Sequence, residues 1–234
     1  MARRKLCSVD ISVTSDEQVE SALESTAGNF ENPYKSVFAY SHNSLGCAKD
    51  ILQGDKASRY DIEIKINLSS NGDVDVLDNC SGMTLGELKG ICERVFLSGK
   101  KGVKLAGGGA GFGMHAFRSF FREATIKTKT KGGRVLEMTL KREKLHGNEI
   151  CETDEDFPYE SGTWVHLSGF DGGARKQKPV DFKDLCFETN RRYALARRNP
   201  RLRLVVLKDW DESTADEGEG GIFEVSRSLR LTDT

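Results

Sequence analysis

A β-hairpin between residues 60 and 77 is the feature that most limits how this 234-residue chain can fold. Apolar and polar residues alternate from Tyr60 to Leu68, and this period of two indicates a strand with one buried face. A turn is predicted at Asn71-Gly72, and a return strand follows up to Leu77. A chain that pairs its strands through tight turns builds a mainly antiparallel sheet, unlike the parallel sheet of regular βαβ units.

The remaining sequence mixes helices with further strands. Helical patterns are predicted at about residues 15–26, 33–54, 85–96, 114–121 and 181–198. Further strands are predicted at about residues 5–13, 124–129, 135–141, 163–167, 202–207 and 222–225, and the acidic stretch 146–160 is expected to be a loop. The pattern predicts an α+β fold, a two-layer sandwich in which a mostly antiparallel, mixed sheet carries its helices on one face.

Charge and cysteine content exclude several classes of protein. The 35 basic and 36 acidic side chains give a net charge of −1, so no overall charge attracts nucleic acid or a membrane. A local basic patch remains between Arg191 and Arg203. The six cysteines include no C-x-x-C pair, which argues against a zinc site and a disulfide framework. No apolar run approaches the ~20 residues of a membrane span, and the N-terminus lacks a signal-peptide core. We expect a reduced protein, cytoplasmic or nuclear, without membrane contact.

Four separated segments carry residues suited to binding a nucleotide. Asn43 lies in the middle of a predicted helix, where asparagine is unfavourable unless its side chain is used. A strand ends at Asp78, which can accept a hydrogen bond from an exocyclic amine, and Gly82 follows it. The glycine-rich run from residue 107 to 113 opens a helix, where backbone N–H groups can bind phosphate. Thr163 opens another strand. Each segment alone also has an ordinary structural explanation, such as an Asx turn or a loop.

In this order, the four segments resemble the N, G1, G2 and G3 motifs of the GHKL superfamily. That superfamily includes type II topoisomerase ATPase subunits, heat-shock chaperones, MutL proteins, microrchidia proteins and sensor histidine kinases. The resemblance covers about residues 35–170 and implies a Bergerat fold, the histidine-kinase-like ATPase fold, with ATP and Mg²⁺ as its ligands. It divides the chain into a segment exchanged between dimer partners (1–30), the ATP-binding core (31–170), and a helix and strand that complete the domain (171–234).

The resemblance also implies a role for each candidate residue. Asn43 would coordinate Mg²⁺, Asp78 would accept from the adenine amino group, and Thr163 would complete adenine recognition. Gly82 and Met83 would shape the base pocket. The ATP lid and the phosphate loop would include Lys100, Gly109, Gly111, Phe112, Gly113 and Met114.

Ala39 departs from the family pattern at the position of the catalytic base. Hydrolysing members carry a glutamate four residues before the asparagine, one helical turn away, and a methyl group cannot accept a proton. Either the protein binds ATP without efficient turnover, or alanine replaces a glutamate in order to trap nucleotide. Glutamate would suit the surrounding sequence equally well, which favours the replacement, with the parent protein an ATP hydrolase. Cys80 is a second departure, because these families have glycine there.

Three functions are compatible with these residues. The preferred one is an ATP-gated clamp that forms a homodimer when nucleotide orders the lid and the N-terminal segment. Its client, nucleic acid or protein, would bind through other domains. The alternatives are a nucleotide-sensing pseudo-ATPase and, third, a protein kinase that uses this fold. A histidine kinase that phosphorylates itself is disfavoured, because no histidine precedes His42.

Overall fold

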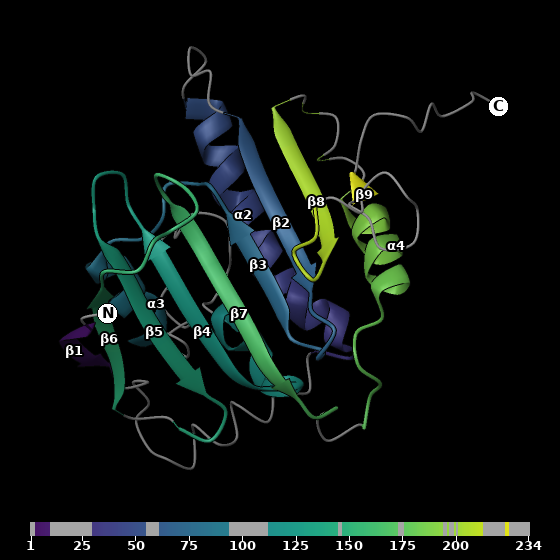
Figure 1. Cartoon of the computed structure of the whole chain (residues 1–234), viewed down its shortest axis with the longest axis horizontal. Coiled ribbons are helices and arrows are strands. Elements are labelled where there is room, and N and C mark those ends of the chain that lie inside the picture. The colour runs from purple at the N-terminus through teal and green to yellow at the C-terminus, as the bar shows by residue number, and fades with distance from the viewer. Residues whose placement is uncertain are drawn as a thin grey trace, which may run out of the picture.

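A single mixed sheet organises the computed structural model, which describes residues 3–9, 30–54, 61–93, 112–144, 147–172, 176–193, 196, 199, 201–212 and 223–224. Over these residues the sheet has nine strands in the order β1-β6-β5-β4-β7-β3-β2-β8-β9 (Figure 1). Every pair is antiparallel except β2 with β8. The strands are β1 (Arg3–Val9), β2 (Ile62–Leu68), β3 (Val74–Asp78), β4 (Phe121–Lys129), β5 (Val135–Lys141), β6 (Asn148–Thr153), β7 (Gly162–Phe170), β8 (Leu202–Lys208) and β9 (Phe223–Glu224).

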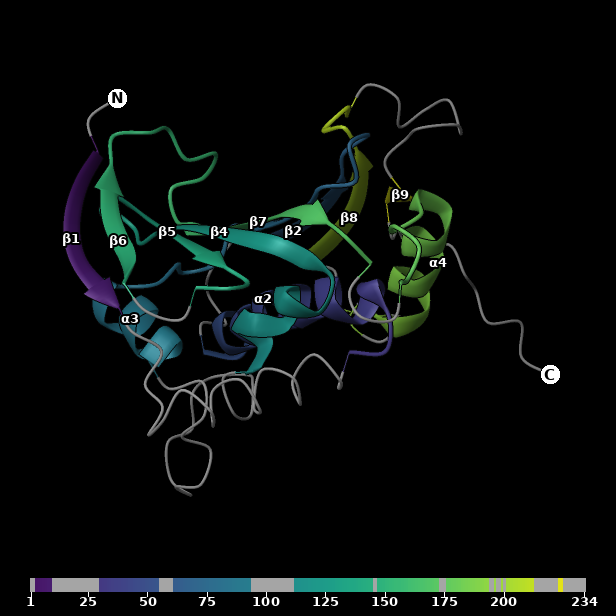
Figure 2. The same cartoon turned by 90° about the horizontal axis from the view of Figure 1, so that it is seen from below.

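The helices cover one face of this sheet, as Figure 2 shows for α2, α3 and η1. They are α2 (Pro33–Gly54), α3 (Leu85–Glu93), the 3₁₀ helix η1 (Phe112–Ser119) and α4 (Phe182–Arg192). The end of α4 reaches the same layer, because Tyr193 packs edge-on against Phe38 of α2, with ring centroids 5.7 Å apart. The predicted two-layer α+β sandwich with a mostly antiparallel mixed sheet is confirmed.

The β2–β3 hairpin explains why one face of the sheet is covered. Ile62, Ile64 and Ile66 are fully buried and belong to the same core cluster as Phe38 of α2. The intervening side chains of β2 point to the other face, as the period of two predicts. The predicted turn also forms, with Gly72 at φ +87°, a left-handed conformation that favours glycine.

Helix α2 is positioned by a proline start and by polar contacts to η1. Pro33 occupies the first helical position, and Asn32 accepts a hydrogen bond from the Lys35 N–H at 3.0 Å, which caps the helix. In its middle, the Tyr40 hydroxyl donates to the Met114 carbonyl at 2.9 Å. These contacts fix α2 and η1 side by side, which matters because both carry predicted site residues.

Three sequence predictions of local structure are corrected. The stretch 146–160 contains strand β6, which pairs with β5 and with β1, so the predicted loop is wrong over Asn148–Thr153. Glu149 and Glu152 concealed this strand, because they lie on either side of the buried Ile150 and Cys151. The helix predicted from Met114 is a 3₁₀ helix that begins at Phe112, and α4 ends at Arg192 and not at residue 198. The predicted helix at 15–26 lies outside the described residues.

Among the described residues, no helix combines the length and the hydropathy needed to cross a membrane.

Candidate functional site

The carboxylate of Asp78 lies at the junction of α2, β3 and β7. The side chain is buried, with 4% of its surface exposed. The Ser44 hydroxyl of α2 donates to Oδ2 at 2.6 Å, while the backbone N–H groups of Cys80 and Thr163 donate to Oδ1 at 3.0 and 3.1 Å. Burial raises the pKa of Asp78, and the three hydrogen bonds oppose that rise only in part. The protein therefore holds a buried acceptor in one fixed orientation.

Two glycines allow the backbone around Asp78 to pack very closely. Gly82 has φ +68°, and a Cβ atom there would lie 2.0 Å from the carbonyl oxygen of Lys129. Gly162 has φ +149°, and a Cβ atom there would lie 2.0 Å from the carbonyl oxygen of Asp78. No side chain fits at either position, so the turn after β3 and the start of β7 are fixed against each other.

Thr128 of β4 connects this turn to β7. Its hydroxyl accepts from the Met83 N–H at 2.8 Å, donates to the Gly162 carbonyl at 3.0 Å, and lies 3.3 Å from the Thr163 hydroxyl. Thr128 is fully buried and pairs with Thr163 in the sheet register. The structure thus brings the predicted residues Met83 and Thr163 together through a residue that the sequence did not single out.

The start of η1 lies directly against Asn43. A Cβ atom at Gly113 would be 3.2 Å from Asn43 Nδ2, 3.5 Å from Asn43 Oδ1 and 3.8 Å from the Ala39 carbonyl oxygen. Asn43 itself is exposed on α2, whereas the neighbouring Met114 is buried. Phe112 is the first residue of η1. The predicted residues Lys100, Gly109 and Gly111 lie outside the described residues.

The fold agrees with that of a solved nucleotide-binding domain. A search of solved structures finds the topoisomerase IV ATP-binding domain of Francisella tularensis, solved with a small-molecule inhibitor, at a TM-score of 0.55. The match covers 84% of this chain and 88% of that chain at 17% sequence identity. This chain therefore shares the overall fold of that domain, the Bergerat fold. No protein-family model matches the sequence, and a search of curated proteins also finds no match.

In this Bergerat fold, residue 39 lies on the α2 turn that precedes Asn43. The Ala39 methyl group is half-buried and packs against the hydrophobic core, so the position carries no proton acceptor. The adjacent His42 is exposed. Over the described residues, no cluster of three or more His, Cys, Asp or Glu side chains could hold a metal ion. The exposed amide of Asn43 lies beside η1 on this turn, and the buried Tyr40 hydroxyl already bonds to η1.

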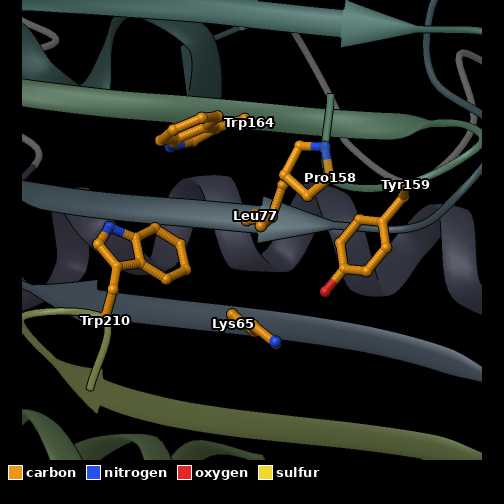
Figure 3. Close-up of a pocket in the computed structure, with 6 residues that line it drawn as sticks. All are labelled: Lys65, Leu77, Pro158, Tyr159, Trp164 and Trp210. Carbon is orange, nitrogen blue, oxygen red and sulfur yellow. The ribbon is translucent and has the colours of Figure 1, made fainter. Parts of the chain in front are cut away.

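The open face of the Bergerat sheet carries a separate aromatic cavity. It has a volume of about 360 Å³, and Trp164 and Trp210 pack edge-on within it, with centroids 5.9 Å apart. Figure 3 shows the lining side chains in front of the strands with the helix behind them. They are Lys65, Leu77, Pro158, Tyr159, Trp164 and Trp210. Because successive side chains of a strand point to opposite faces, the sheet separates Trp164 from Thr163 and Asp78. The sequence did not predict this cavity.

Proposed function

We propose that this chain binds Mg²⁺–ATP on the helix-covered face, with the adenine amino group donating to Asp78. The observation that carries the proposal is the partly occupied carboxylate of Asp78. A carboxylate offers about four acceptor positions; one O–H and two N–H groups of the protein occupy three of them, and the weak thiol donor of Cys80 is a further neighbour. The remaining position suits an exocyclic amine, and a buried acceptor is costly unless it is used.

The neighbouring residues provide the other parts of a nucleotide site. Thr163 and Met83, which share the Thr128 hydroxyl network, border the base, and Gly82 keeps the turn close to it. Asn43 supplies an amide oxygen, a ligand type that Mg²⁺ prefers. The resemblance assigns the phosphates to the lid and the G2 segment, which would bind them through Lys100, Gly109, Gly111, Phe112, Gly113 and Met114; the structure describes the last three of these residues. The solved relative in fold is itself an ATP-binding domain.

The absence of a carboxylate at Ala39 makes this chain a poor hydrolase. Water bound beside the γ-phosphate has no general base on the α2 turn before Asn43. We propose that the domain works as an ATP-gated homodimerising clamp whose hydrolysis is blocked at residue 39, with its nucleic-acid or protein client bound through other domains. A nucleotide sensor without turnover is the second candidate, and the same alanine favours it.

Calorimetric titration with Mg²⁺–ATP tests the binding proposal. We expect one saturable site per chain. Asn43→Ala should lower the affinity at least tenfold, because it removes one contact to the metal ion, whereas His42→Ala, at an exposed neighbouring residue, should change it little. No saturable binding, or equal binding by the Asn43 variant, would refute the site.

Phosphate release then separates the two candidate functions. Ala39→Glu restores a carboxylate one turn before Asn43, and recovered ATP turnover would support the clamp with a blocked active site. Continued inactivity of a variant that still binds ATP would support the sensor. Light scattering with a non-hydrolysable ATP analogue tests dimerisation, and an unchanged monomer would contradict the clamp.

A further inference from the structure

Two cysteine thiols meet where α2 contacts the turn after β3. The Cys80 thiol donates to the Ser44 carbonyl of α2 at 3.6 Å, and the Cys47 sulfur lies 3.3 Å from the Ser81 hydroxyl. Ser44 and Cys47 are three residues apart on α2 and share one side of the helix. Cys80 and Ser81 are consecutive in the turn. The two contacts therefore place both sulfur atoms at the same junction between α2 and the turn after β3.

The two thiols differ in reactivity. The neighbouring Cys80 thiol is the largest cause that lowers the pKa of Cys47, and Ser81 adds to the effect while desolvation opposes it. The same interaction with Cys47, together with burial, raises the pKa of Cys80. Cys47 is partly exposed, whereas Cys80 is 1% exposed. Cys47 is thus the accessible nucleophile, and Cys80 is placed to react second.

We propose that Cys47 and Cys80 are a thiol-modification site that closes to an intramolecular disulfide on reaction with a low-molecular-weight disulfide such as oxidised glutathione. The Cys47 thiolate attacks one glutathione sulfur, the glutathione S–S bond breaks, and one glutathione leaves as thiolate. The Cys80 sulfur then attacks Cys47, expels the second glutathione, and forms the protein disulfide. The two protein thiols are oxidised and the glutathione disulfide is reduced, and both thiol protons end on the two released glutathiones.

The disulfide also acts on the proposed ATP site, and this half of the inference rests on the proposed function. An S–S bond of about 2.05 Å draws the turn and α2 together. Gly82 fixes the turn against β4, so the displacement is taken up at α2 and at Cys80. α2 and the turn supply two of the three donors to Asp78, the Ser44 hydroxyl and the Cys80 N–H. The disulfide therefore weakens ATP binding by disturbing the acceptor.

Peptide mapping tests the disulfide without any nucleotide. The chain is incubated with oxidised glutathione, blocked with N-ethylmaleimide and digested, and we expect a cross-linked peptide that joins Cys47 to Cys80. Cys47→Ser and Cys80→Ser should each abolish it, whereas Cys7→Ser, which removes another partly exposed free thiol, should not. Glutathione retained on Cys47 without a cross-link, or a cross-link that forms between other cysteines instead, would overturn the proposal.

Titration of the oxidised and reduced chains with Mg²⁺–ATP tests the coupling. We expect oxidation to weaken binding about tenfold, the effect of losing one hydrogen bond, and dithiothreitol to restore it. Equal affinities would overturn the coupling and leave the disulfide intact. If the reduced chain binds no ATP, the proposed function fails and the coupling falls with it, while the peptide map still decides the disulfide.

Discussion

Replacing Asp78 with asparagine should separate folding from nucleotide binding. Asparagine has the same shape, and its Oδ1 can accept from the Cys80 and Thr163 N–H groups as the aspartate does. Its Nδ2 then takes the place of Oδ2 and donates to the Ser44 hydroxyl. That hydroxyl can turn its proton toward the Tyr40 carbonyl, 3.4 Å away. Every protein hydrogen bond around residue 78 therefore has a counterpart in Asp78→Asn.

The effect on stability follows from the pKa of Asp78. Burial raises the folded-state pKa above the unfolded value, so the folded state holds the proton more tightly. Stability therefore falls as the pH rises from the unfolded pKa through the folded pKa, and it stays lower above that range. At neutral pH the aspartate opposes folding. We expect Asp78→Asn to be at least as stable as the parent chain in urea unfolding near neutral pH.

The effect on binding has the opposite sign. An amide donor in the variant would face the adenine amino group, which is also a donor, so a hydrogen bond to a charged acceptor is lost. We expect a loss of about 3 kcal/mol, or roughly 100-fold in Kd for ATP. Inosine triphosphate has an acceptor at that position, so the variant should lose the preference for ATP over inosine triphosphate. An unchanged Kd in a folded variant would refute adenine recognition at Asp78, and an unfolded variant would refute the hydrogen-bond argument.

Three further predictions concern glycines and one histidine. Gly82→Ala should destabilise the chain more than Gly132→Ala in urea unfolding, because both have left-handed φ angles but only the first lacks space for a Cβ; equal losses would refute the close packing. Gly113→Ala should weaken Mg²⁺–ATP binding about tenfold in calorimetry, because the added methyl group crowds the Asn43 amide. The control Gly86→Ala places its methyl group in open space on α3, so it should leave binding unchanged and add roughly 0.5–1 kcal/mol of stability. His166 hydrogen-bonds to the buried carboxylate of Asp75 on β3, and this contact raises the pKa of His166. The stabilising effect of His166 is therefore complete below its unfolded pKa and is lost as the pH rises through its folded pKa. His166→Gln should therefore cost more stability near pH 5.5 than near pH 9, and a pH-independent cost would contradict this.

The parts of the fold that were predictable are those with local signals. Alternation along one strand and a glycine turn indicate the β2–β3 hairpin, and helical spacing indicates α2. Strand β6 was missed because its outward glutamates resemble a loop, and its pairing with β1 joins residues far apart in the sequence. Local composition carries no information about such a partner.

In the candidate site, too, the residues with a local sequence signal were predictable, and the residues that matter through tertiary contacts were not. Asp78 ends a recognisable strand, so its position could be inferred from the sequence. Ser44 and Thr128 could not, because their importance arises from contacts across α2–β3 and β4–β7. The meeting of Cys47 with Cys80 is likewise a product of tertiary packing. Only the departure from glycine at residue 80 was visible in the sequence.

An amide NMR titration with Mg²⁺–ATP tests the central claim most directly, because the molecule offers two competing surfaces. If adenine binds at Asp78, the N–H signals of Cys80 and Thr163, which donate to that carboxylate, should shift together and saturate with one Kd. Shifts confined to the indole signals of Trp164 and Trp210, with Cys80 and Thr163 unmoved, would place the ligand in the cavity on the opposite face and contradict the account.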